Sequence, residues 1–116
     1  MTHYNGCNQR INGDLFEIRV MQRFQRRCDV LFAQRTAGSR GLFDLMVVYL
    51  DGRTKLISCK RDGYIKPDER KALARFLARK PANLSCEVWY KRSARKYGRY
   101  FLNTPDDLAK VATRAR

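Results

Sequence analysis

The sequence predicts an α/β fold: a single domain, spanning residues 1–116, with a mixed central β-sheet flanked by helices. Three observations lead to this prediction. Apolar residues near the N-terminus recur at three- and four-residue steps, as on one face of a helix. Runs rich in Val, Ile, Tyr and Leu follow, and they alternate with further helical segments. The chain has 116 residues, a length that suffices for one core but not for two, and its hydrophobic fraction of 44% is ordinary for a globular protein.

The first predicted element is a helix with Asn12 or Asp14 as its N-cap. Glu17 lies one position from its apolar face. It is either a surface residue paired with an arginine such as Arg23, or an acid that flanks a site beside the core. The apolar face is expected to consist of Ile11, Leu15, Ile18, Met21, Phe24 and Cys28.

Three strands are predicted next, at residues 30–34, 43–50 and 54–60. The second is so uniformly apolar that we expect a central strand covered on both faces. Asp51-Gly52 between the second and third predicts a hairpin. In the third strand, Ser58 and Lys60 share one face because side chains alternate.

The segment 36–41 is rich in small residues and connects the first two strands. It is either a plain flexible connection or a loop that offers Arg35, Ser39 and Arg40 to phosphates. Asp44 follows at the start of the apolar strand, where a carboxylate is costly to bury without a cation or a donor. This position favours the phosphate-binding interpretation.

A second helix is expected to begin at Pro67 and to end before Pro81. Asp68 and Glu69 lie in its first turn, where they favour the helix dipole; this interpretation is preferred to that of a catalytic acid. Its core face comprises Ala72, Leu73, Phe76 and Leu77.

Two further strands are predicted at residues 86–91 and 99–103, joined by a basic connection at 91–99. The connection interleaves cations with tyrosines, which favours contact with nucleic acid over a solvated loop. Thr104 and Pro105 then predict the start of a last helix, docked by Leu108 and Val111.

The net charge is strongly positive, with 25 Lys and Arg against 11 Asp and Glu, a formal charge of +14 and a pI near 10.2. Such a charge on a small domain points to a polyanionic partner. A basic peripheral membrane protein is the less favoured alternative, because no amphipathic helix stands apart from the core pattern. The candidate DNA-binding residues are Arg35, Ser39, Arg40, Arg61, Arg92, Arg95 and Lys96.

The N-terminal segment lacks the apolar stretch of a signal peptide, and no apolar run reaches spanning length. We therefore expect a cytoplasmic protein without a membrane association and with reduced cysteines. His3 and Cys7 could form half of a zinc site, although a frayed N-terminus is the preferred interpretation. Cysteines 28, 59 and 86 lie within apolar patterns and are expected to act as small core residues.

Four features occur in a characteristic order: Glu17, the Arg35-Thr36-Ala37-Gly38-Ser39 loop, Asp44 and Lys60. Together they resemble the archaeal-type Holliday junction resolvases of the PD-(D/E)XK nuclease superfamily. The likeness runs from about residue 13 to 103, and the loop followed by aspartate is its most specific part. The resemblance implies a restriction-endonuclease-like domain.

The resemblance also implies a function: a divalent-metal-dependent endonuclease that resolves branched DNA as a homodimer. Catalysis would involve Glu17, Asp44, the position of Ser58, and Lys60. Glu17, Asp44 and a backbone carbonyl near Cys59 would hold Mg²⁺, with Mn²⁺ as a substitute. Lys60 would position the attacking water, while the arginine and serine of the loop contact the DNA backbone.

At one position the chain departs from the family pattern, which has an acidic residue where this chain has Ser58. Either the metal is held with one carboxylate fewer, or another acid substitutes, or catalysis is impaired. Two alternatives therefore remain beside the resolvase: a nuclease for ordinary duplex or flapped DNA, and a non-catalytic DNA-binding protein with a degraded site.

The catalytic pair places a condition on the hairpin, because a one-residue shift moves every side chain to the other face of a sheet. A two-residue Asp51-Gly52 turn sets Asp44 opposite Cys59, on the face away from Lys60. A loop of three residues, 51–53, sets Asp44 opposite Lys60. The nuclease interpretation therefore requires an odd-length loop or a bulge.

Overall fold

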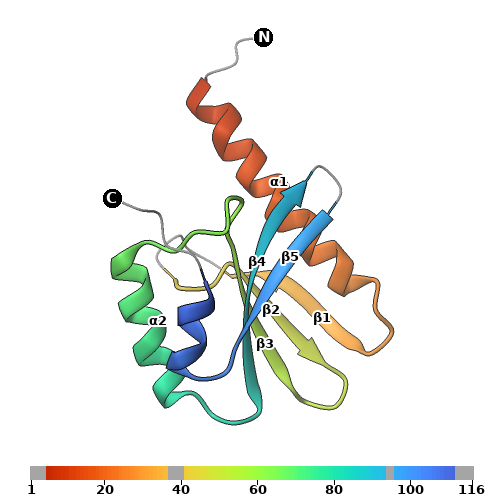
Figure 1. Cartoon of the computed structure of the whole chain (residues 1–116). Helices are drawn as coiled ribbons and strands as arrows, with labels where there is room; N and C mark the ends of the chain where they lie inside the picture. The colour runs from red at the N-terminus through yellow and green to blue at the C-terminus, as the bar shows by residue number, and fades with distance from the viewer. Residues whose placement is uncertain (1–4, 37–40, 94–95, 112–116) are drawn as a thin grey trace.

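Five strands form one sheet in the computed structural model, with the order β1-β2-β3-β4-β5 (Figure 1). The structure describes residues 5–36, 41–93 and 96–111, with side chains from Leu15 onward in the first helix. The elements along the chain are α1 (Asn5–Gln25), β1 (Val30–Arg35), β2 (Leu45–Tyr49), β3 (Thr54–Cys59), α2 (Pro67–Arg79), β4 (Leu84–Ser93), β5 (Lys96–Leu102) and a 3-10 helix η1 (Pro105–Lys110).

The sheet is mixed. Strands β1, β2 and β3 are antiparallel neighbours, as are β4 and β5, whereas β3 and β4 run parallel. Parallel neighbours need a crossover connection, which α2 supplies. The predicted α/β class, a mixed sheet flanked by helices, is confirmed.

Two apolar clusters lie on opposite faces of the sheet. One packs beneath α1 and includes Val20, Leu45, Ile57 and Trp89. The other packs beneath α2 and η1, and its fully buried members include Ile65, Leu73 and Val88. Leu108 and Val111 belong to this second cluster, so the predicted docking of the last helix is confirmed.

The buried face of α1 differs from the predicted one. Phe16, Val20 and Phe24, spaced four residues apart, are at most 5% exposed, whereas Leu15 is 40% exposed. The large rings decide the rotation of the helix, because Phe16 meets Tyr97 and Phe24 meets Trp89 at centroid distances of 5.5 and 5.4 Å. The expected face was therefore wrong by about one residue.

The cysteine prediction holds for two of the three residues. Cys86 is buried and Cys59 is half-buried, but Cys28 is exposed because it follows the end of α1. Burial raises the pKa of the Cys86 thiol to about 11. The Cys28 prediction failed because it extended the helical spacing beyond Gln25.

Strand β2 is covered less completely than predicted. Leu45, Val47 and Tyr49 are buried, but Met46 and Val48 between them are only half-buried. The α2-side cluster draws its sheet residues mainly from β4 and β5, so the β2 surface on that face lies toward the edge of the helix layer.

Strands β4 and β5 extend well into the segment predicted to be a basic connection. Lys91 pairs with Tyr97, and Ser93 pairs with Lys96. The described residues of the predicted loop therefore belong to a β-hairpin, because they pair across the two strands. The N-terminus of η1 follows the prediction: Thr104 and Asp107 form a capping box.

Candidate functional site

The hairpin of β2 and β3 has a loop of odd length. The Tyr49 N–H donates to the Arg53 carbonyl at 2.9 Å, which leaves residues 50–52 as a three-residue loop. Gly52 adopts a φ of +90° there, a conformation that favours glycine. The required odd-length loop is confirmed, although it lies one residue earlier than expected.

The pairing of β2 with β3 ends at Leu45 and Ile57, and the Asp44 N–H donates to the Ile57 carbonyl, so Asp44 does not stand opposite its predicted partner Lys60. Residues 58 and 60 nevertheless share a face, because Lys60 contacts α2 while Cys59 packs toward α1. Asp44, Ser58 and Lys60 lie at the same end of the hairpin, where the Asp44 carboxylate accepts a hydrogen bond from the Cys59 N–H.

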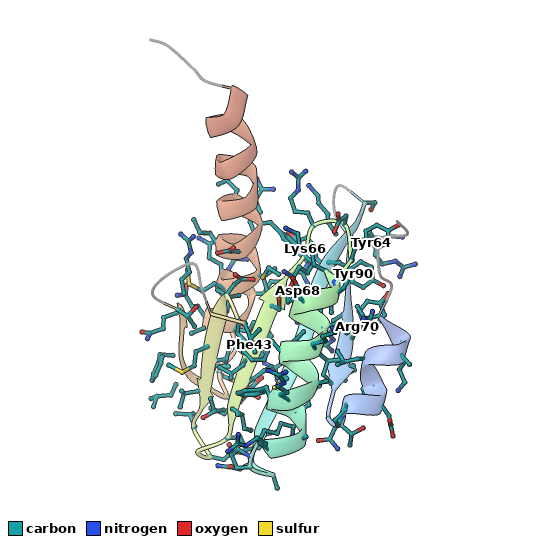
Figure 2. All side chains as sticks on the ribbon, turned by 90° about the vertical axis from the view of Figure 1, so that its left-hand side faces the viewer. Phe43, Tyr64, Lys66, Asp68, Arg70 and Tyr90 are labelled. Atoms are coloured by element: carbon teal, nitrogen blue, oxygen red, sulfur yellow. The ribbon has the colours of Figure 1, made fainter. Side chains whose placement is uncertain are left out.

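The backbone of Asp44 is held from both sides. Its N–H donates to the Ile57 carbonyl at 2.8 Å, and its carbonyl accepts from the Thr36 N–H at 2.9 Å. The chain also turns here: Phe43 packs with the α2-side cluster, whereas Leu45 packs with the α1-side cluster. Figure 2 shows Phe43 beside α2. A side chain on a backbone fixed in this way is preorganised.

The Asp44 carboxylate accepts a hydrogen bond from the Cys59 N–H at 2.7 Å. Burial raises the pKa of Asp44 above its usual value, although this hydrogen bond and the Lys60 ammonium both favour the charged form. Glu69 adds to the rise through its negative charge. The hydrogen bond and the nearby cations therefore do not fully offset the cost of burying the Asp44 carboxylate in its charged form.

Glu69 is the acid that the sequence interpretation left outside the site. Its carboxylate lies 2.6 Å from the Lys60 ammonium. Asp68, the neighbouring acid, is exposed, and Figure 2 shows it at the N-terminal end of α2. The sequence could not predict this contact, because Lys60 and Glu69 are nine positions apart and a loop separates them. Spacing along the chain predicts contacts only within a helix or strand.

Ser58 is 1% exposed, and its hydroxyl has no hydrogen-bond partner among the described residues. Buried polar groups are normally paired. Ser58 lies two residues before Lys60, as its predicted role requires, but the residue itself brings no charge.

Glu17 and Arg35 form the opposite margin of the site. The Arg35 guanidinium lies 3.1 Å from the Glu17 carboxylate, and both side chains are partly exposed. Charges of Glu17, Asp44, Lys60 and Arg35 all act on the Cys59 thiol, which places them around one point. Burial raises the pKa of this thiol strongly, so at neutral pH its sulfur is protonated and unsuited to hold a metal.

The donor chemistry fits a divalent cation such as Mg²⁺. Asp44 and Glu17 offer hard carboxylate oxygens, and the raised pKa of Asp44 shows a buried charge that a cation would stabilise. Within residues 5–36, 41–93 and 96–111, no three acidic, histidine or cysteine side chains gather closely enough to hold a metal. Mg²⁺ is commonly bound by one or two carboxylates with waters, so two acids meet this requirement.

Some of the predicted DNA-binding residues lie in the described part of the structure and others lie outside it. In the described part, Arg61 and Arg92 line one hollow of about 720 Å³ together with Lys60, and Lys96 is exposed at the start of β5. Ser39, Arg40 and Arg95 lie outside the described residues, as do His3 and the side chain of Cys7.

Comparison with known protein families, with curated proteins and with solved structures found no match. In the part of the chain described, the helices are too short or too polar to cross a membrane.

Proposed function

We propose that this protein is a divalent-metal-dependent endonuclease for branched DNA, most concretely a Holliday junction resolvase that acts in the cytoplasm as a homodimer. One observation carries the proposal: the Asp44 carboxylate, bonded to the Cys59 N–H, lies at the same end of the β2–β3 hairpin as Lys60, with Glu17 and Arg35 at the margin. The high positive charge supports a nucleic-acid substrate.

Each side chain has a distinct part in the proposed reaction. Asp44 and Glu17 would hold Mg²⁺, which supplies Lewis-acid stabilisation of charge on the phosphate. Lys60 would orient the attacking water and offset negative charge in the transition state. Glu69 holds the Lys60 ammonium at 2.6 Å and is the nearest candidate to replace the acid missing at Ser58. Two such sites in a homodimer would make the paired cuts that a junction requires.

The test is cleavage of a four-way junction, compared with a linear duplex of matching sequence, with and without Mg²⁺. Asp44→Asn should abolish cleavage while junction binding stays intact or becomes tighter, because the change keeps the shape and removes one anion near the phosphate. Asp51→Asn is the matched control, since Asp51 lies in the hairpin loop with an exposed side chain. Full activity of Asp44→Asn would overturn the proposal.

The same assay separates the alternatives. Junction-selective paired cuts support the resolvase, and equal cutting of both substrates supports a general nuclease. The missing acid at Ser58 favours a third candidate, a DNA-binding protein with a degraded site. Tight binding without cutting, at every Mg²⁺ concentration, would support that candidate.

A further inference from the structure

Four arginines, named here the arginine stripe, lie in the C-terminal part of α1 and directly after it. Arg19 and Arg23 are four residues apart on one side of the helix, and Arg26 and Arg27 follow its last residue, Gln25. Arg19 and Arg23 each lie three residues after a core residue, Phe16 and Val20. Packing of the core face thus fixes the direction of these two arginines.

The hairpin of β4 and β5 forms a wall opposite this stripe. Trp89 pairs with Arg99 and Lys91 pairs with Tyr97, so these four residues share one face of the sheet. The Arg23 guanidinium lies 4.6 Å from the centre of the Tyr97 ring. Helix and hairpin therefore meet at this contact.

Two hollows lie between helix and hairpin, a third lies between residues 59–62 and the hairpin, and each shares residues with the next. The first, of about 570 Å³, shares Tyr97 with a middle hollow of about 170 Å³. The middle one shares Arg61 and Lys91 with the hollow of about 720 Å³ beside Lys60. Together they make one groove, named here the α1 groove, which leads from the candidate catalytic lysine to Arg99.

The α1 groove is lined by nine cationic residues: Arg19, Arg23, Arg26, Arg27, Lys60, Arg61, Lys91, Arg92 and Arg99. Among the described residues, acids balance only a few of them. Asp29 pairs with Arg27, Glu69 pairs with Lys60, and Glu87 lies 3.9 Å from Arg99. Asp62 is the one acid among the described residues of the lining.

Cations gathered in this way repel one another, so an anionic ligand along the groove would stabilise them. Arg23, Arg26, Arg27 and Arg99 line one hollow, so a nucleic-acid backbone that passes there would meet four cations. The small middle hollow favours a single strand over a duplex lying in the groove.

We propose that the α1 groove binds the backbone of one single strand of DNA as it leaves the candidate catalytic end. The choice of DNA as the ligand rests on the proposed function, whereas the groove as an anion-binding site is inferred from the cations that line it. None of these arginines was predicted from the sequence to contact DNA, because helical spacing identifies the apolar face and not what lies opposite the polar one.

The test is binding of a labelled single-stranded oligonucleotide and of a duplex, measured by fluorescence anisotropy in EDTA at several salt concentrations. The variant is Arg23→Ala/Arg26→Ala. Its single-strand affinity should fall about tenfold, and the slope of log affinity against log salt should decrease by about 1.4, or about 0.7 for each lost phosphate contact. Its duplex affinity should fall less.

Arg75→Ala/Arg79→Ala is the matched control, because it removes two exposed arginines from α2 and leaves the same net charge. Circular dichroism and thermal unfolding check that both variants fold. Equal losses in both variants, or a larger loss for the duplex than for the single strand, would overturn the proposal. Binding in EDTA does not require cleavage, so a protein that cuts nothing but shows the selective loss retains the groove and loses only the nuclease assignment.

Discussion

Ser58 is buried beside two charged residues with a hydroxyl that has no partner in the described structure. Its small side chain leaves the acidic part of the site to Asp44, Glu17 and Glu69, each of which comes from a different element or loop. At this scale the chemistry depends on single charges and on the hydrogen bonds that hold them.

Replacement of Ser58 by alanine tests whether the hydroxyl is in fact unpaired. A buried polar group without a hydrogen bond costs about 1–3 kcal/mol, so Ser58→Ala should keep or raise the free energy of unfolding, by about 1 kcal/mol. Urea denaturation measures this difference. A loss of more than about 1 kcal/mol would mean that the hydroxyl has a partner, such as an ordered water.

Glu69→Gln should lower the pKa of Asp44. The Glu69 carboxylate now raises that pKa, and its removal also releases the Lys60 ammonium from its ion pair. Carboxyl NMR titration of the metal-free protein measures the change, with Asp68→Asn as the control on the neighbouring position. An unchanged Asp44 pKa would show that Glu69 does not act on the site.

Among the elements, β4 carries the most unusual charge. Glu87 is 1% exposed, and its carboxylate lies 2.7 Å from the Lys55 ammonium and accepts a hydrogen bond from the Trp89 indole N–H at 2.7 Å. These contacts join β3 and β4, the parallel pair at the centre of the sheet. Glu87 also lies 3.9 Å from Arg99, which lines the α1 groove, so the ion pair adjoins the groove.

Glu87→Ala should destabilise the protein by about 3–5 kcal/mol, because it leaves the largely buried Lys55 ammonium without its partner. Lys55→Met combined with Glu87→Met should recover most of this loss, since apolar residues can replace a buried ion pair at little cost. Guanidinium unfolding of the three variants measures the coupling. A double variant as unstable as Glu87→Ala would contradict this account.

The whole molecule carries a formal charge of +14, which should give two opposite responses to salt. Between about 0.01 and 0.1 M NaCl the screening length falls from about 30 to about 10 Å. Repulsion within the folded protein then weakens, so the free energy of unfolding should rise. DNA affinity should fall over the same range, because each counterion that DNA releases gains less entropy when the surrounding salt concentration is higher.

Thermal unfolding and anisotropy in the same buffers test this pair of responses. Parallel changes in stability and affinity would contradict the assignment of the surface cations to phosphate contacts. Arg53→Ala is a useful control for affinity, because Arg53 pairs with Asp51 at the hairpin loop, among residues that line none of the three hollows.

The sequence by itself determined the α/β class, the approximate positions of the helices and strands, and the condition that the hairpin loop be odd. These features follow from local spacing: helical and strand periods are properties of neighbouring residues. The cost of burying a carboxylate also singled out Asp44, because that cost depends on a residue and its immediate surroundings.

The tertiary structure alone decided the rotation of α1, the pairing of the segment 91–99 and the approach of Glu69 to Lys60. Periodicity states which side chains share a face, but it does not state what covers that face. Phe16 and Phe24 found their aromatic partners on β4 and β5, and this choice turned the arginines toward the hairpin. Contacts across a loop depend on the path of the whole chain, and no local spacing contains that path.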